Sequence, residues 1–308
     1  MNLLMNLPKK LPRINSLSLA ALAGIAISTP AFATVTIDYV YVGNAGNAAD
    51  TSGYGAVAYA YNIGKYEVTN AQYGEFLNAK GASNSDGIYN SNMAAYGITQ
   101  NGISGSFTYS VTGALANHPV VWVSWYDAAR FANWMLNGQG SGDMTEGAYE
   151  LIGNTGIIAV NPGAQIHLPS EDEWYKAAYY NKGDKPGYWL YTNGQNSITT
   201  ADANYDFITG GTTDVGTYSG DPSPYGTFDQ GGNVWEWNDA VIFGSDRGLR
   251  GGSYYNADSN LASSFRDNAG PLFEDLATGF RLVSSVPEPT SLVLTMLAGS
   301  MMLIRRKR

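Results

Sequence analysis

The 308-residue sequence contains no cysteine and only two histidines. The absence of cysteine excludes disulfide frameworks, thiolate metal sites, iron–sulfur clusters and cysteine nucleophiles. Two histidines are too few for a multi-histidine metal centre. Charged residues are also scarce at 14% of the chain, whereas 44% is hydrophobic, which is typical of a folded protein rather than a disordered one. The 37 glycines and 22 tyrosines indicate a loop-rich domain with aromatic packing and few long helices.

Residues 1–33 have the order of a secretory signal peptide. Three basic residues precede an apolar run at 17–27, and the segment closes on the small-residue sequence Ala31-Phe32-Ala33. Basic residues, an apolar run and small residues in this order are typical of a secretory signal peptide. We therefore expect an exported protein, against the alternative that the segment is an ordinary first helix.

Residues 287–308 begin with Pro287-Glu288-Pro289, continue through an apolar stretch and end in four basic residues. The stretch is shorter than the about 20 residues that a full membrane span needs. The order resembles the PEP-CTERM sorting signal of Gram-negative bacteria, whose carriers are trimmed by an exosortase. The resemblance implies an exosortase-like processing partner, membrane contact only through this segment, and delivery to the envelope, outer surface or extracellular matrix. A plain C-terminal anchor is the alternative.

The body of the chain, residues 34–286, has the size of one domain. It contains ten of the 17 Lys and Arg residues and 25 of the 26 Asp and Glu residues, a formal charge of −15. Nucleic acid is therefore not expected as a partner, because the phosphate backbone binds basic surfaces. Cations, neutral glycans and basic proteins remain compatible with this charge, which also serves the solubility of an exported protein.

Three segments begin with a side-chain acceptor followed three residues later by a polar partner, the pattern of a helix N-terminal cap. The pairs are Thr69 with Gln72, Ser124 with Asp127, and Ser170 with Glu173. Apolar residues follow each pair at helical spacing, so we expect three helices that each bury one face. Short strands are expected near 35–41 and 62–68. The polar, glycine-rich stretches 78–117, 138–163 and 179–246 are expected to be irregular.

Six short motifs occur in order along the body. They are Gly64-Lys65-Tyr66-Glu67-Val68-Thr69-Asn70, His118-Pro119-Val120-Val121-Trp122-Val123-Ser124-Trp125-Tyr126-Asp127-Ala128, Leu168-Pro169-Ser170-Glu171-Asp172-Glu173-Trp174, Gly232-Asn233-Val234-Trp235-Glu236-Trp237, Arg250-Gly251-Gly252-Ser253-Tyr254 and Gly279-Phe280-Arg281. Together they resemble the formylglycine-generating enzyme, or sulfatase-modifying factor, superfamily over nearly the whole body. The resemblance implies an α+β fold, a variant of the C-type lectin fold with few short helices and strands and much irregular loop.

The resemblance does not carry over the chemistry of that superfamily. In the formylglycine-generating enzymes a pair of cysteines after the Gly-Gly-Ser-aromatic turn binds copper and activates oxygen. Residues 253–261 occupy that segment here without a cysteine. Because a thiolate supplies both the Cu(I) ligand and the redox group, we expect neither copper nor oxidase activity and assign no catalytic residue. A related branch, the ergothioneine-type sulfoxide synthases, uses iron held by several histidines of an additional helical domain, which these 308 residues do not include.

The position of the former oxygen pocket suggests a ligand groove instead. The residues expected to line it are Trp235, Ser253, Asn256 and Arg266. They offer an aromatic face with hydroxyl, amide and guanidinium groups, a set suited to a glycan or a peptide loop. Two alternatives stay open: an enzyme with a non-thiol, metal-dependent mechanism, and a structural matrix protein whose own side chains fill the groove.

One calcium site is implied by the resemblance. Asp229 and Glu236 would provide side-chain oxygens, and Gly232 and Val234 would provide carbonyl oxygens. Calcium binds six to eight oxygens, which glycine-containing turns can bring together. The alternative is a turn in which Asp229 accepts from local amides and Glu236 pairs with an arginine such as Arg250.

Other polar residues favour structural roles. The acids Glu171, Asp172 and Glu173 suit the first turn of a helix better than paired catalytic carboxylates. We expect Arg250 and Arg281 to form buried ion pairs with acids of the core. His118 and His167 lie beside prolines, where packing or hydrogen bonding is expected. Two histidines are enough for a Ser-His-Asp arrangement, but the spacing of Ser, His and Asp residues along the sequence does not indicate one.

Overall fold

The computed structural model describes residues 34–151, 158–183 and 187–286. The predicted signal peptide and sorting segment, 1–33 and 287–308, lie outside the described residues. Within the described part of the chain, no helix combines the length and the apolar character needed to cross a membrane.

The helices are short and few, as expected. Their bounds are α1 Asn70–Lys80, α2 Trp125–Leu136, α3 Glu171–Tyr179 and α4 Asp258–Leu261, with 3₁₀ turns η1 Ser91–Tyr96 and η2 Gly113–Leu115. The three longer helices begin directly after Thr69, Ser124 and Ser170, and each of these residues forms a complete capping box. The predicted helix starts are therefore confirmed, because the caps satisfy backbone amides that a helix leaves unpaired.

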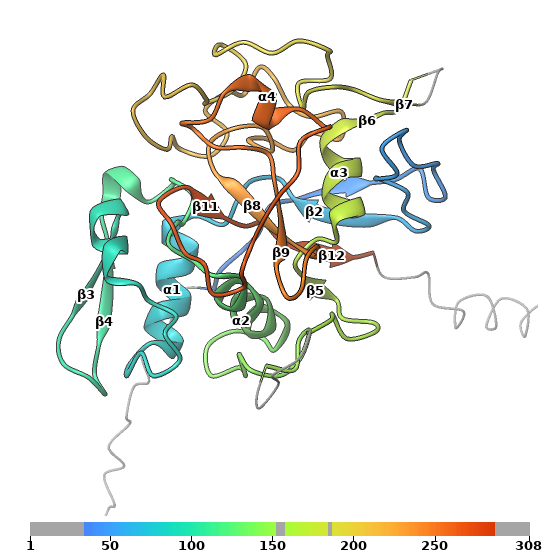
Figure 1. Ribbon diagram of the computed structural model, residues 1–308. Helices are drawn as coiled ribbons and strands as arrows, with labels where there is room; N and C mark the ends of the chain where they lie inside the picture. The colour runs from blue at the N-terminus through green and yellow to red at the C-terminus, as the bar shows by residue number, and fades with distance from the viewer. Residues whose placement is uncertain (1–33, 152–157, 184–186, 287–308) are drawn as a thin grey trace, which may run out of the picture. The chain divides into compact units, whose positions relative to one another are not determined.

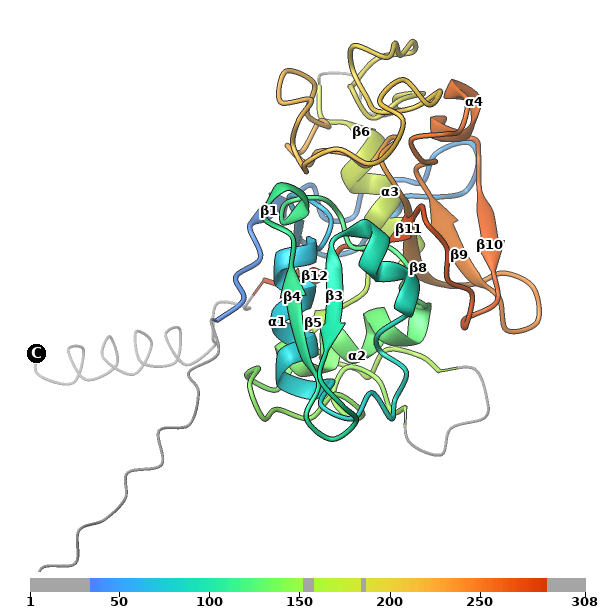
Figure 2. The same ribbon diagram turned by 90° about the vertical axis from the view of Figure 1, so that its left-hand side faces the viewer.

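The strands form a small antiparallel sheet, a small mixed sheet in which β11 and β8 are parallel, and two two-stranded pairs. Their bounds are β1 Tyr39–Val42, β2 Tyr61–Gly64, β3 Ile98–Asn101, β4 Thr108–Val111, β5 Ile166–His167, β6 Tyr180–Asn181, β7 Gly187–Tyr188, β8 Trp235–Val241, β9 Arg247–Arg250, β10 Asp267–Ala269, β11 Thr278–Gly279 and β12 Val283–Ser285. One sheet has the order β1-β2-β12-β5 and the other β10-β9-β8-β11. Figure 1 shows β8 and β9 in the middle of the domain, and Figure 2 shows β10 beside them. The second predicted strand is shorter than expected, because the chain leaves β2 after Gly64.

An aromatic core joins α1 and α2 to the end of the domain. Phe131 of α2 stacks on Tyr73 of α1 at 5.9 Å between ring centroids and meets Phe76 edge-on at 5.5 Å. Phe280 approaches Phe131 at 5.5 Å from the segment between β11 and β12. All four rings are fully buried, and such edge-to-face contacts add to the burial of apolar area.

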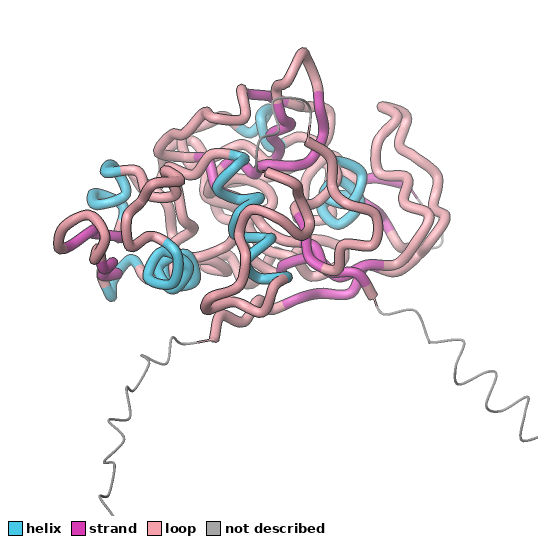
Figure 3. The backbone as a smooth tube through the Cα atoms, turned by 90° about the horizontal axis from the view of Figure 1, so that it is seen from below, coloured by secondary structure: helices cyan, strands magenta, loops and turns pink. Residues whose placement is uncertain are grey.

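Irregular backbone makes up most of the domain (Figure 3). Residues 189–234 contain no helix or strand and lie together with α4 at the top of Figure 1. Close backbone contacts hold this region in place. A side chain at Gly232 would lie 2.3 Å from the carbonyl oxygen of Asn204, so only glycine fits there. The expected hairpin-like excursion in 78–117 is confirmed as the β3–β4 pair.

Candidate functional site

The segment that replaces the cysteine pair forms a tight turn after β9. Gly251 and Gly252 have φ values of 98° and 70°, which glycine adopts without strain. The hydroxyl of Ser253 donates to Oδ1 of Asn256 at 2.5 Å, and the backbone N–H of Ser253 donates to the same oxygen at 3.0 Å. The structure therefore brings two of the predicted groove residues together. Their hydrogen bonds stabilise the turn, and Ser253 is fully buried.

Trp235 differs from the expectation. We expected it to be the tryptophan with a surface role, but it is 7% exposed and its ring lies 5.8 Å from that of Phe265. It lies at the start of β8, where its backbone pairs with Thr278 of β11. The three described cavities contain none of the four predicted groove residues in their walls. Their role as ligand contacts thus stays a prediction.

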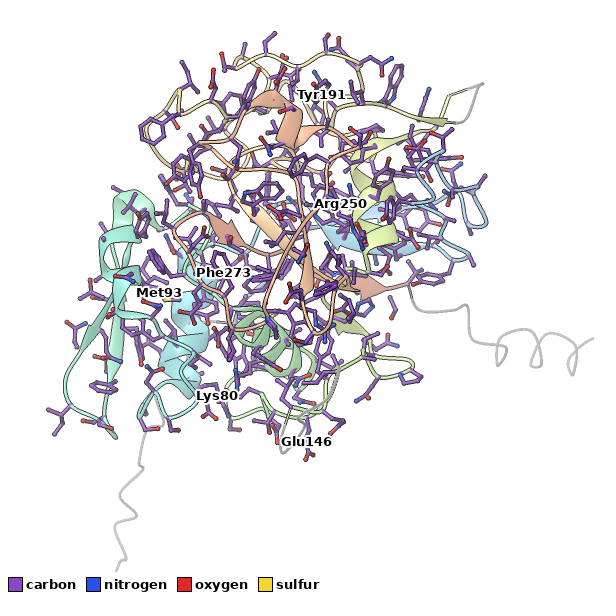
Figure 4. The ribbon with its side chains drawn as sticks, viewed as in Figure 1. Lys80, Met93, Glu146, Tyr191, Arg250 and Phe273 are labelled. Atoms are coloured by element: carbon purple, nitrogen blue, oxygen red, sulfur yellow. The ribbon has the colours of Figure 1, made fainter. Side chains whose placement is uncertain are left out.

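Arg266 also lies elsewhere than expected. Its side chain is 29% exposed, and its Nη2 lies 2.7 Å from Oε2 of Glu171. Glu171 is buried at the start of α3, where the Nε of Arg250 also donates to Oε1 at 2.8 Å. Figure 4 shows Arg250 in the interior near α3. Glu171 therefore links the end of β9 and the residue before β10 to α3, which agrees with the structural interpretation of the acids in this helix turn.

Five aromatic rings, of which Phe207 and Tyr255 are exposed, Tyr96 and Trp122 are half-buried and Tyr254 is buried, gather near the Ser253 turn. We call Tyr96, Trp122, Phe207, Tyr254 and Tyr255 the aromatic surface. Phe207 is 59% exposed and Tyr255 is 44% exposed, while Tyr254 lies between them at centroid distances of 6.0 and 5.2 Å. The ring of Trp122 lies 6.3 Å from that of Tyr96. These rings come from η1, the segment before α2, the long loop and the turn after β9, so the surface exists only in the folded chain.

Trp122 is held in a strained conformation at this surface. Its φ is 61°, a left-handed value that bulky residues rarely adopt. Its backbone N–H donates to the carbonyl oxygen of Asp275 at 2.8 Å, which fixes the ring beside Tyr96. The indole Nε1–H is buried and has no partner among the described residues. Strain of this kind and a free donor are features that occur at binding sites. The sequence shows Trp122 within a motif but gives no sign of its backbone angle.

Glu236 lies at the centre of the second sheet in a closed ion pair. Arg281 donates from Nε to Oε2 and from Nη2 to Oε1, both at 2.6 Å. The indole Nε1 of Trp174 donates to Oε2 at 2.7 Å. Both charged residues are fully buried. The expectation of a buried acid partner for Arg281 is confirmed; the partner of Glu236 is Arg281 rather than Arg250.

Two further acids, Glu67 and Asp229, lie near this pair. Burial and the negative charge of Asp229 raise the pKa of Glu67 well above its usual value, and burial raises the pKa of Asp229 to about 6. Oε2 of Glu67 is buried without a partner among the described residues. Three carboxyl groups and one guanidinium therefore share this buried region, and the raised pKa values favour the protonated forms of Glu67 and Asp229.

The geometry around Asp229 bears on the predicted calcium site. Asp229 has a φ of 61° and accepts from the backbone N–H of Gly216 at 2.6 Å. Within the described ranges, no three His, Asp or Glu side chains are arranged to hold a metal ion. A cation at Asp229, Gly232, Val234 and Glu236 therefore depends on backbone oxygens, and Glu236 would share its carboxylate with Arg281. The calcium site stays a prediction.

The two histidines make local contacts. Nδ1 of His118 lies 2.8 Å from the hydroxyl of Thr212, and its Nε2 lies 3.6 Å from Asp214. Nδ1 of His167 lies 2.7 Å from the carbonyl oxygen of Leu168. The contacts of both histidines agree with the hydrogen-bonding roles expected from the sequence.

Comparison with known sequences identifies relatives of which this chain matches only a part. The serine/threonine-protein kinase pkn1 of Chlamydia pneumoniae is 25% identical over 249 residues, covering 75% of this chain and 34% of that protein. Hercynine oxygenase of Mycobacterium tuberculosis is 26% identical over 254 residues, covering 72% of this chain and 52% of that protein. The chain thus spans about a third to a half of the length of these relatives.

Solved structures and a family model agree on the fold. Treponema denticola variable protein 1 superimposes with a TM-score of 0.57 at 22% identity, covering 83% of this chain and 98% of that one. CarF superimposes with a TM-score of 0.52 at 23% identity, covering 82% and 100%. The fold is the α+β, formylglycine-generating-enzyme-like variant of the C-type lectin fold, and the model of the sulfatase-modifying factor enzyme 1-like domain matches residues 40–286. This chain therefore belongs to the sulfatase-modifying factor enzyme 1-like domain family.

Proposed function

We propose that this family member is an exported, non-catalytic binding module whose aromatic surface binds a neutral glycan. The observation that carries the proposal is the exposed aromatic surface beside a turn that lacks the cysteine pair. Exposed rings such as Phe207 and Tyr255 can stack on the apolar faces of sugar rings. The side chain of Asp275, which hydrogen-bonds to Tyr255, adds an acceptor.

Charge supports a neutral polymer over an anionic one. The body carries a formal charge of −15, which repels uronic-acid or phosphate polymers at low salt. A glycan surface also agrees with the proposed route of the protein through a signal peptide and a PEP-CTERM-like segment to the envelope or matrix, where exopolysaccharide is available. A protein ligand is the other occupant that such a surface could accept.

Replacing Tyr255 by alanine is expected to weaken glycan binding about tenfold or more, because exposed aromatic residues dominate the energy of such interfaces. Retention of the purified protein would be measured on immobilised neutral glucan, mannan and galactan, and on a uronic-acid polymer as the anionic counterpart. Tyr41→Ala is the matched control, since Tyr41 is an exposed tyrosine on β1. The proposal is overturned if no neutral polymer retains the protein, or if Tyr255→Ala is retained as strongly as the unaltered chain.

We also propose a structural calcium ion near Asp229. Asp229→Asn keeps a side chain that tolerates the left-handed backbone at this position but removes its charge. We expect this variant to lose bound calcium and to melt a few degrees lower in calcium buffer, because a ligand that binds only the folded state stabilises it. Metal analysis after dialysis, together with thermal melts, checks this. Equal calcium content in both proteins would refute the site.

The pH dependence of stability gives a second test of the proposed site at Asp229. Burial raises the pKa of Asp229 from 3.8 to about 6, so in chelator its protonated form favours the folded state. The free energy of unfolding should therefore contain a contribution that is present below about pH 4 and is lost as the pH rises through about 6. Asp229→Asn should lack this contribution, and calcium should reverse it in the unaltered protein. Denaturant titrations at several pH values measure it.

A further inference from the structure

A cavity of about 570 Å³ lies apart from the aromatic surface. Its walls come from segments that are distant in sequence: the entry to β2, the loop before β5, the start of α3, β8 and the end of β12. Tyr59, Pro162, His167, Glu173, Asp239 and Val283 contribute to the lining. A cavity of this volume accommodates a small organic molecule.

Asp239 provides a carboxylate that lacks part of its hydrogen bonding. Oδ2 accepts from the hydroxyl of Tyr149 at 2.7 Å. Oδ1 is buried and has no partner among the described residues. Arg247 bonds to the backbone carbonyl oxygen of Asp239 at 3.1 Å and lies over the ring of Trp125 at 3.8 Å. A buried acceptor of this kind calls for a donor that the described residues do not supply.

His167 and Glu173 add acceptors to the wall, which also contains side chains that can both donate and accept, namely Asn161, Gln165, Ser170 and Ser285. Nδ1 of His167 faces the carbonyl oxygen of Leu168, which can only accept, so Nδ1 carries the proton. In the neutral ring Nε2 then keeps its lone pair. Glu173 accepts from the backbone N–H of Ser170 with Oε2 and from the hydroxyl of Tyr59 with Oε1. The wall thus combines negative charge with acceptors.

Apolar groups form the rest of the wall. Val160, Pro162, Ala164 and Val283 line the cavity, and Tyr59, which is 53% exposed, stands at its edge. A primary ammonium ion has three N–H donors and a positive charge, which match acceptors of this kind, and an aliphatic body matches the apolar wall. Tyrosine rings also attract cations through their faces.

From this arrangement we infer that the cavity binds a primary ammonium group with an aliphatic body, held by Asp239 and His167 and covered by Tyr59. The ammonium group comes from a free alkylamine or from the side chain of a lysine in another chain. The site is independent of the aromatic surface, since the two share no residue, and it requires no calcium.

The test uses butylammonium with the full chain and measures affinity by calorimetry. Butylammonium should bind, whereas tetramethylammonium, which has the charge but no N–H donor, should bind at least tenfold more weakly. Asp239→Asn should reduce the affinity for butylammonium at least tenfold, because a charge-assisted hydrogen bond is lost. Asp258→Asn, an exposed acid on α4, is the matched control and should leave it unchanged.

The pH profile separates Asp239 from its neighbours. Burial raises the pKa of Asp239 to about 7, while Tyr149, His167 and Arg247 act against this rise and Glu173 adds to it. The affinity for butylammonium should increase from pH 6 to pH 8 as Asp239 ionises, and Asp239→Asn should remove most of this increase. If Asp239→Asn does not fold, Tyr59→Ala replaces a half-exposed residue at the edge and should still weaken binding.

Two outcomes overturn the inference: no binding of butylammonium by the folded protein, or equal binding of tetramethylammonium. A lysine-containing peptide distinguishes the sources. Tighter binding of the peptide supports the site with a lysine side chain as its natural ligand, and binding of butylammonium alone supports it with a free amine.

Discussion

Replacing Arg281 by methionine is expected to lower the free energy of unfolding by about 3–5 kcal/mol, because it leaves the carboxylate of Glu236 buried without a counter-charge. Arg281 donates to both oxygens of Glu236 and also to the carbonyl oxygens of Gly64 and Phe228. It therefore joins β2, the long loop and β8 through one side chain. Denaturant titration monitored by tryptophan fluorescence measures the loss.

Two further variants show whether the unpaired charge is the cause. Arg266→Met removes an arginine that is partly exposed and leaves Glu171 paired with Arg250, so a loss of at most about 1 kcal/mol is expected. Arg281→Met combined with Glu236→Gln removes both charges and should recover a large part of the lost stability. A loss within about 1 kcal/mol for Arg281→Met alone would contradict the role of this ion pair.

Local features were predictable from the sequence. A helix start depends on residues three positions apart, so Ser124 with Asp127 and Ser170 with Glu173 indicated where α2 and α3 begin. Ordered motifs indicated the family and its fold, although the sheet pairing of β12 between β2 and β5 was not visible in any local pattern.

The exposure of single side chains was not predictable. Trp235 and Trp122 both lie in family-like motifs, but the first is buried at the start of β8 while the second, which has a left-handed backbone, is partly exposed. Arg266 was expected at a groove and instead pairs with Glu171, 95 residues earlier. The cavity around Asp239 depends on segments that only the folded chain brings together. Such long-range contacts, which local sequence patterns do not show, determine which side chains are exposed.

A second prediction is that the protein lacks formylglycine-generating oxidase activity. The formylglycine-generating enzymes that this domain resembles use a pair of cysteines, and the segment 253–261 holds Ser253 and Asn256 in a hydrogen-bonded turn instead. Neither a hydroxyl nor an amide replaces a thiolate as a soft metal ligand or as an electron donor. We therefore expect the purified protein to leave a cysteine-containing sulfatase peptide unchanged, with or without added copper.

An assay with this peptide shows whether the domain has lost the oxidase activity that depends on the cysteine pair. The peptide is incubated with the purified protein, copper and oxygen, and an aldehyde is detected by mass spectrometry and by reaction with a hydrazine probe. A cysteine-dependent member of the family is the positive control. We expect the peptide to keep its cysteine in the presence of this protein. Aldehyde formed in proportion to the amount of this protein would contradict it.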